Sequence, residues 1–265
     1  MSDDRATDFA GLIVDLEAEH RSLAGVLASR SIDLDADTPA ETWTIRDQLS
    51  HLAGFDEAAT TSLTDPDGFR SDLARRLEEG DHPIEGYRQL GRSMPGSGVV
   101  AWWADANRAL LDAAADADPR QRVPWYGPDM SVMSSITARV METWAHGVDI
   151  RDALGVAPEA TARLRHVCHI GIGARPFAYA VRELAPPDVA IDVTLRAPDG
   201  STWSWGPGDA TDVISGSALG FALLATQRRH VDDTDVVAAG PAAEEWLGII
   251  QAFAGAPGAG RQPLG

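Results

Sequence analysis

The chain has no lysine and only one cysteine, and both absences exclude kinds of chemistry. All 22 basic residues among the 265 are arginine, so Schiff-base catalysis, a lysine general base and a P-loop lysine are excluded. Cys168 is the only cysteine, which excludes an intrachain disulfide and a thiolate-rich metal site. Any metal ion would therefore have to be bound by histidine and carboxylate side chains.

Positive charge and long apolar runs are also scarce. The formal net charge of −18 would repel phosphate backbones and anionic lipids, which argues against nucleic acid and membrane surfaces as partners. No stretch approaches the roughly 20 apolar residues of a membrane-spanning helix. The first residues, MSDDRATDFAG, are acidic and polar, whereas a secretory signal has a basic start and then an apolar run. A cytoplasmic location is expected.

The chain is long enough for two domains, and its first part has the pattern of helices. Apolar residues recur at intervals of three and four from Phe9 to Leu27, which is typical of an amphipathic helix. Thr44, with Asp47 three residues later, predicts the start of a second helix that runs to about Leu63. Further helices are expected at residues 69–79, 99–117, 131–154 and 158–184, with irregular chain in the rest of 64–98.

The pattern changes to a period of two after Pro186 and Pro187. Apolar and polar residues alternate over 189–196, which predicts a strand, and a second strand is expected at 202–205. The segment DVISG, a helix up to Arg229, the strand-like DVVAAG and a helix from Pro241 follow. The predicted fold class is α+β, with a helical bundle at 1–184 and a small α/β domain at 185–265.

Four polar residues lie along one side of the helix predicted at 131–154. Arg139, Glu142, His146 and Asp149 share this side at about 100° per residue. Glu142 and His146 are one turn apart and can converge on one ion, for which His51 in the second helix is the natural third ligand. A set of histidine and carboxylate ligands leaves a position for water or substrate, as in catalytic zinc sites.

Two residues are expected to assist this site. Asp149 would orient a ligating histidine, and Arg139 would either bind a substrate carboxylate or neutralise Glu142. The spacing also has a second interpretation, in which the histidines are core residues satisfied by hydrogen bonds and bind no metal. The residues alone leave both interpretations open.

Two stretches resemble a known family. WTIRDQLSHLAGFDEA and RVMETWAHGVDIRDALG are similar to the signature stretches of the DinB-like metal-binding four-helix bundles, and most similar to their mycothiol-dependent maleylpyruvate isomerase branch. The resemblance covers about the first 155 residues, and the C-terminal α/β domain is also similar to the one in that branch. It implies that His51, Glu142 and His146 bind zinc.

The resemblance also implies a function. We expect a zinc-dependent enzyme that uses a low-molecular-weight thiol for isomerisation or S-transfer on a small electrophilic substrate. Mycothiol is the expected thiol, because the arginine, alanine and glycine bias is typical of a GC-rich, actinobacterial genome. Two alternatives remain open, a metal-hydroxide hydrolase or lyase and a non-catalytic metal-binding or ligand-binding protein. A homodimer is compatible with each of these functions.

Overall fold

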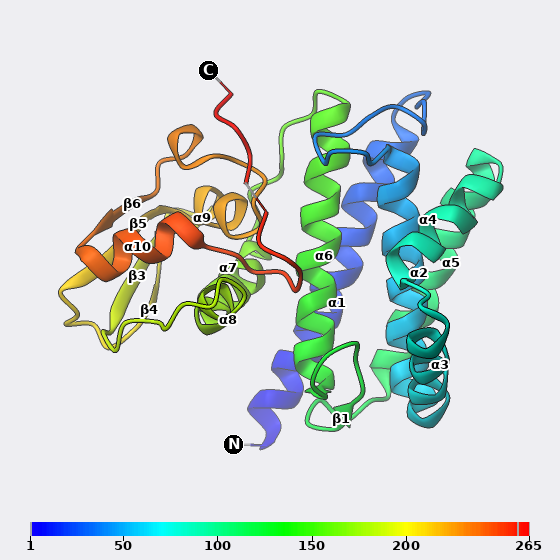
Figure 1. Ribbon diagram of the computed structural model, residues 1–265, viewed down its shortest axis with the longest axis horizontal. Coiled ribbons are helices and arrows are strands. Elements are labelled where there is room, and N and C mark those ends of the chain that lie inside the picture. The colour runs from blue at the N-terminus through cyan, green and yellow to red at the C-terminus, as the bar shows by residue number, and fades with distance from the viewer. Residues whose placement is uncertain (1, 259, 265) are drawn as a thin grey trace. The chain divides into compact units, whose positions relative to one another are not determined.

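The computed structural model describes residues 2–258 and 260–264 as two compact units, one ending at Pro158 and one beginning at Glu159 (Figure 1). The predicted α+β class is confirmed, with a helical first unit and a small sheet in the second. The predicted boundary between residues 184 and 185 lies inside the second unit. This is because helix α7 (Leu164–Gly173) packs on helix α9 (Ala218–Ala225), which follows the sheet's third strand in the chain.

Four long helices build the first unit, and they contact one another side by side. They are α1 (Ser2–Ala28), α2 (Ile45–Thr64), α5 (Gly96–Ala115) and α6 (Val132–Ala153). The predicted start of α2 is confirmed, because Thr44 and Asp47 form both hydrogen bonds of a capping box. Fully buried apolar side chains such as Leu16, Leu49, Leu110 and Ile136 from the four helices fill the interior. None of the described helices combines the length and apolar character that a membrane crossing needs.

The connection between α2 and α5 is more regular than predicted. It holds the expected α3 (Pro66–Glu79) and an unexpected α4 (Pro83–Ser93). The glycines in this segment do not break α4, because Gly91 allows α4 to pack closely on α2. A Cβ atom on Gly91 would overlap with the Ser50 side chain. A short hairpin, β1 (Arg122–Val123) with β2 (Met130–Ser131), then precedes α6.

The second unit contains a four-stranded sheet in the order β4-β3-β5-β6. Its strands are β3 (Ile191–Arg196), β4 (Thr202–Trp205), β5 (Asp212–Ser217) and β6 (Val237–Ala239), and β3 and β5 are parallel. The other helices are α8 (Arg175–Ala180), the 3-10 turn η1 (Val231–Asp233) and α10 (Pro241–Ile249). The single helix predicted at 158–184 is divided into α7 and α8, because Pro176 in the first turn of α8 has no N–H to continue α7.

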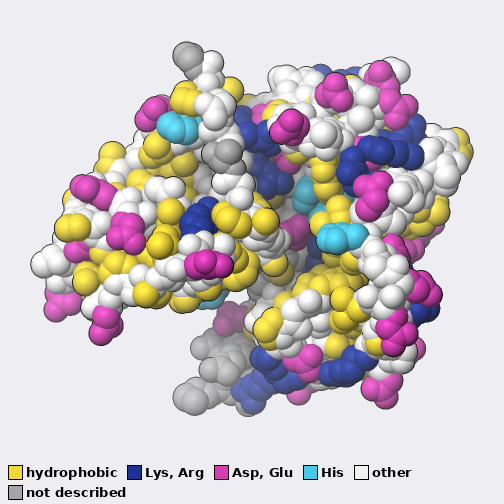
Figure 2. All heavy atoms as spheres, viewed as in Figure 1, with side chains coloured by type: hydrophobic (Ala, Val, Ile, Leu, Met, Phe, Trp, Pro, Cys, Tyr) yellow, Lys and Arg dark blue, Asp and Glu magenta, His cyan; other side chains and the backbone are white. Residues whose placement is uncertain are grey.

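The acidic side chains are spread over the surface. On the face in Figure 2, aspartate and glutamate side chains are scattered over both units, and arginine side chains lie among them. The acidic side chains on this face therefore do not form one patch.

Candidate metal centre

Three predicted ligands meet between α2 and α6. His51 lies on α2, and Glu142 and His146 lie one turn apart on α6. The Nε2 atoms of His51 and His146 are 3.2 and 3.3 Å from the same oxygen, Glu142 Oε2. One donor atom from each of the three residues lies within 4.8 Å of the other two. Among the described residues, these three form the group of histidine and acidic side chains whose donor atoms converge closely enough to hold a metal ion. The expected convergence is therefore present.

Aromatic rings cover the two histidines. The Trp43 ring is stacked on His146 at 5.9 Å between ring centroids and meets His51 edge-on at 5.4 Å. The Phe55 ring lies one turn after His51 on α2 and 4.5 Å from its ring. These rings exclude water from the flanks of the imidazoles, which strengthens electrostatic interactions at the site.

Hydrogen bonds fix the orientation of His146. The Thr38 hydroxyl donates to the Trp43 carbonyl at 2.8 Å, so its oxygen accepts from Gln48 Nε2 at 3.0 Å. Gln48 Oε1 then faces His146 and accepts from its Nδ1. Because Nδ1 carries the proton, His146 Nε2 presents a lone pair to Glu142 Oε2. Two lone pairs face each other there, and a cation between them would stabilise this arrangement.

The protonation of the ligands fits a cation site. Burial and the neighbouring His146 lower the pKa of His51 to about 4, so its ring is neutral at neutral pH, as a metal ligand must be. Burial raises the pKa of Glu142, but the interactions of the carboxylate with His146 and His51 outweigh burial and hold the pKa well below its usual range. Two imidazoles and one carboxylate are a donor set that fits zinc and leaves a fourth position.

Arg139 pairs with an aspartate of α2 inside the bundle. Its guanidinium is 3% exposed and its Nε donates to Asp56 Oδ1 at 2.7 Å. It neutralises the fully buried Asp56 on α2, and the two roles expected of it at the metal site stay predictions. His20 on α1 lies 3.7 Å from the other oxygen of Asp56, and burial lowers its pKa. Asp56 thus joins α2 to α6 inside the bundle.

Asp149 is fully buried one turn beyond His146. It lies outside the group of converging donor atoms. The ring nitrogen of His146 that it was expected to hold is bound by Gln48. A contribution of Asp149 to the site stays a prediction.

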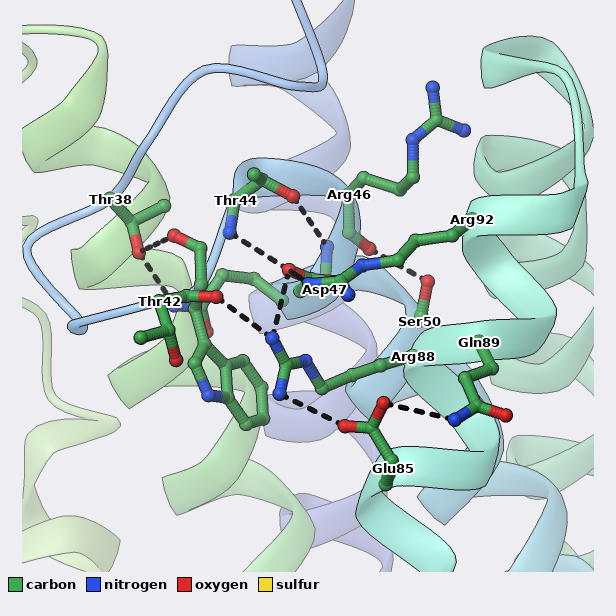
Figure 3. A network of polar contacts seen from close by, with 12 residues as sticks. Thr38, Thr42, Thr44, Arg46, Asp47, Ser50, Glu85, Arg88, Gln89 and Arg92 are labelled. Atoms are coloured by element: carbon green, nitrogen blue, oxygen red, sulfur yellow. Dashed lines mark hydrogen bonds and ion pairs between the residues drawn. The ribbon is translucent and has the colours of Figure 1, made fainter.

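A polar network at the start of α2 lies beside the site (Figure 3). The buried Asp47 carboxylate accepts from Arg92 of α4 at 2.9 and 2.8 Å, and Arg88 of α4 is 3.5 Å away. The Arg88 guanidinium lies 5.0 Å over the Trp43 ring. The network therefore holds the ring that stacks on His146.

Gln48, Trp43 and Asp56 also belong to this region, although none of them was predicted as part of it. Gln48 lies three residues before His51 and Asp56 five residues after it, so helical spacing could have placed Gln48 on the side of His51. Nothing in the spacing shows that Trp43, which precedes the helix, folds over the histidines.

The fold and the site define a helical-bundle protein of the DinB-like class with a candidate metal centre. The chain matches the family described as mycothiol maleylpyruvate isomerase N-terminal domain over residues 16–151. Two uncharacterized proteins from two strains of Mycobacterium tuberculosis are each 43% identical over 251 residues, which cover 94% of this chain and 97% of theirs. The chain belongs to the mycothiol maleylpyruvate isomerase N-terminal domain family.

Solved structures agree on the fold. The crystal structure of the mycothiol-dependent maleylpyruvate isomerase is similar with a TM-score of 0.56 at 15% identity, over 87% of this chain and 92% of that chain. The structure of a histidine-to-alanine mutant of that enzyme gives a TM-score of 0.55. The resemblance noted in the sequence is thus confirmed for the family and the fold.

Proposed function

We propose that the protein is an enzyme that binds one zinc ion with His51, Glu142 and His146 and uses a small thiol, mycothiol, on an electrophilic small molecule. The observation that carries the proposal is the convergence of these three donor atoms within 4.8 Å between two helices. Membership of a family named for a mycothiol enzyme supports the thiol. Zinc at such a site lowers the pKa of a thiol toward neutrality, which makes it a nucleophile at neutral pH.

The chain itself offers neither a reactive thiol nor a lysine amine as a nucleophile. Cys168 is buried in the second unit, where its thiol contacts the Ala218 carbonyl and burial raises its pKa to about 12. A thiol in that state does not act as a nucleophile at neutral pH. The chain also has no lysine. The nucleophile therefore comes from the cofactor, whereas the protein binds and orients it.

The surrounding residues have defined parts in this function. Gln48 keeps the proton of His146 on Nδ1 and so leaves Nε2 as a ligand. Trp43 and Phe55 cover the histidine rings and exclude water from their flanks. Addition of the thiol to a conjugated double bond, rotation and elimination would give isomerisation, whereas retention of the thiol on the substrate would give S-transfer.

Metal analysis and thiol titration test the proposal. Untagged protein purified without chelator should contain about one zinc per chain, and the His51→Ala, His146→Ala double variant should contain none. Mycothiol added to cobalt-substituted protein should produce a sulfur-to-metal charge-transfer band. If zinc-loaded protein instead hydrolyses esters or amides without thiol, and cobalt protein shows no new band, the metal-hydroxide alternative is correct.

A further inference from the structure

A second feature of the first unit is a cavity of about 260 Å³ between α2, α3 and α4. Polar groups on its wall are Glu57 and Thr61 of α2 and Asp72 of α3, and aromatic rings are Phe69, Tyr87 and Tyr126. This volume lies below the roughly 300–1,000 Å³ of pockets for drug-sized ligands. The cavity therefore fits one small ring better than a large molecule.

The cavity lies on the same side of α2 as the candidate metal centre. Ala58, which lines it, follows His51 by two helical turns, which is about 10 Å along the axis. Phe55 lies between them, 4.5 Å from the His51 ring and 5.3 and 5.5 Å from the rings of Tyr87 and Tyr126. A ligand that reaches from the cavity to the candidate metal centre would have to span about 10 Å along α2 and pass the Phe55 ring.

The charges of the cavity disfavour anions. Its single guanidinium, Arg76, donates to Asp72 at 2.6 Å and to Asp81 at 2.6 Å, so its charge is already neutralised. Of the two carboxylates on the wall, Asp72 is paired with Arg75 and Arg76, whereas Glu57 accepts from Trp102 Nε1 at 2.8 Å. A dicarboxylate placed here would meet the Glu57 carboxylate and an arginine, Arg76, that already pairs with two aspartates. The cavity is suited to a neutral or cationic polar group.

The aromatic residues stay neutral and offer ring faces. Burial raises the pKa of both Tyr87 and Tyr126, so both keep their phenol protons at neutral pH. Their hydroxyl oxygens are 3.4 Å apart, and Phe69 is 5% exposed with its ring 5.3 Å from the Tyr126 ring. Hydroxyl groups of a ligand can donate to the two carboxylates in charge-assisted hydrogen bonds, and its C–H face can pack on the rings.

We propose that this cavity binds a neutral polyhydroxylated ring of hexose type, carried by the thiol whose sulfur goes to the metal centre. Carboxylates that accept from hydroxyls, phenols that donate, and aromatic faces together match such a ring, whereas they repel a dicarboxylate substrate. The inference rests on the proposed function only in assigning the ring to the thiol cofactor. Binding of the ring itself requires no metal.

The test uses methyl α-D-glucopyranoside, which has ring hydroxyls but no sulfur, on the full-length protein. Saturation-transfer NMR should show contact with the wild type, with or without zinc, and maleate should not displace the sugar. Leu73→Trp fills the cavity and should weaken binding at least about tenfold, which is roughly 1.4 kcal/mol. Leu77→Trp, one turn further on α3 but 74% exposed, is the matched control and should bind as the wild type does.

A second variant guards against misfolding of the first. Tyr126→Phe keeps the ring and removes the hydroxyl, so it should weaken binding by about three- to tenfold while the fold is kept. Sugar binding that Leu73→Trp and Tyr126→Phe leave unchanged, or the absence of sugar contact in the wild type, would overturn the inference. The His51→Ala, His146→Ala variant separates the two proposals, because it should lose zinc and still bind the sugar.

Discussion

Gln48 on α2 and His146 on α6 are joined through a hydrogen bond between the Gln48 Oε1 and the His146 Nδ1. The Gln48 amide is itself oriented by Thr38, so the imidazole has one tautomer and one direction. Groups of this kind, which hold a ligand without touching the metal, change metal affinity by roughly 10- to 100-fold. Gln48→Leu should therefore weaken zinc binding by about that factor and leave the helical content unchanged.

Competition titration with a zinc chelator measures this effect. Gln89→Leu, on the exposed side of α4, is the matched control and should have wild-type affinity. A Gln48→Leu variant that binds zinc as tightly as the control would show that Gln48 has no part in holding His146.

The Asp56–Arg139 pair predicts a change in stability. Asp56→Leu leaves the guanidinium of Arg139 buried without its partner, which should destabilise the protein by about 3–5 kcal/mol. Asp56→Leu with Arg139→Met replaces both charges by apolar groups and should recover most of that loss. His20 does not oppose this recovery, because burial lowers its pKa and favours the neutral ring.

Urea unfolding followed by circular dichroism measures both variants. The informative quantity is the difference between the single and the double variant. If the double variant is no more stable than Asp56→Leu, the instability of the single variant does not come from the unpaired, buried charge of Arg139.

The convergence of two of the candidate ligands could be predicted because they follow the period of one helix. Glu142 and His146 are four residues apart, and this spacing places both on one side of any helix. Arg139 shares that side in sequence, but its partner Asp56 comes from another helix, so its ion pair depends on packing that the spacing does not contain. The fold class followed from the change of period near Pro186, whereas the boundary did not, because it depends on where α7 packs.

Helix α4 was not predicted because its formation also depends on packing against another helix. Gly86 and Gly91 lower helix propensity, and local sequence alone favours a loop there. In the structure, packing of α4 on α2 overrides this propensity. The glycines of this interface are on both helices, since Gly54 of α2 leaves room for the Tyr87 ring of α4.

Gly54 gives a direct test of that packing. A Cβ atom at this position would overlap with the Tyr87 ring, so Gly54→Ala should destabilise the protein by roughly 1–3 kcal/mol. Gly11→Ala is the control, because no atom lies near its Cβ on the exposed side of α1, and it should stabilise the helix by about 0.5–1 kcal/mol. Thermal unfolding compares the two. Equal effects of both substitutions would contradict the close contact of α2 and α4.

The Asp47 carboxylate predicts how stability depends on pH. Burial raises its pKa, but hydrogen bonds from Arg92 and from the Thr44 backbone and the charge of Arg88 outweigh this effect, so the folded-state pKa is lowered. In the unfolded chain the pKa is about 3.9. The folded state therefore holds the ionised carboxylate more strongly, and the stabilisation is fully present above the unfolded pKa and lost as pH falls through the lowered folded value.

Asp47→Asn should remove this contribution. At neutral pH the variant should be less stable than the wild type by roughly 1.5–3 kcal/mol, the range for hydrogen bonds to charged groups. The difference should shrink as the pH falls below about 4 and be small near pH 2, where both proteins lack the charge. Asp105→Asn, on the exposed side of α5, controls for the loss of one negative charge and should change stability by less than about 0.5 kcal/mol. Urea unfolding at several pH values gives the comparison. A deficit of Asp47→Asn that stays constant down to pH 2 would mean that the lost stability comes from the shape of the side chain and not from its charge.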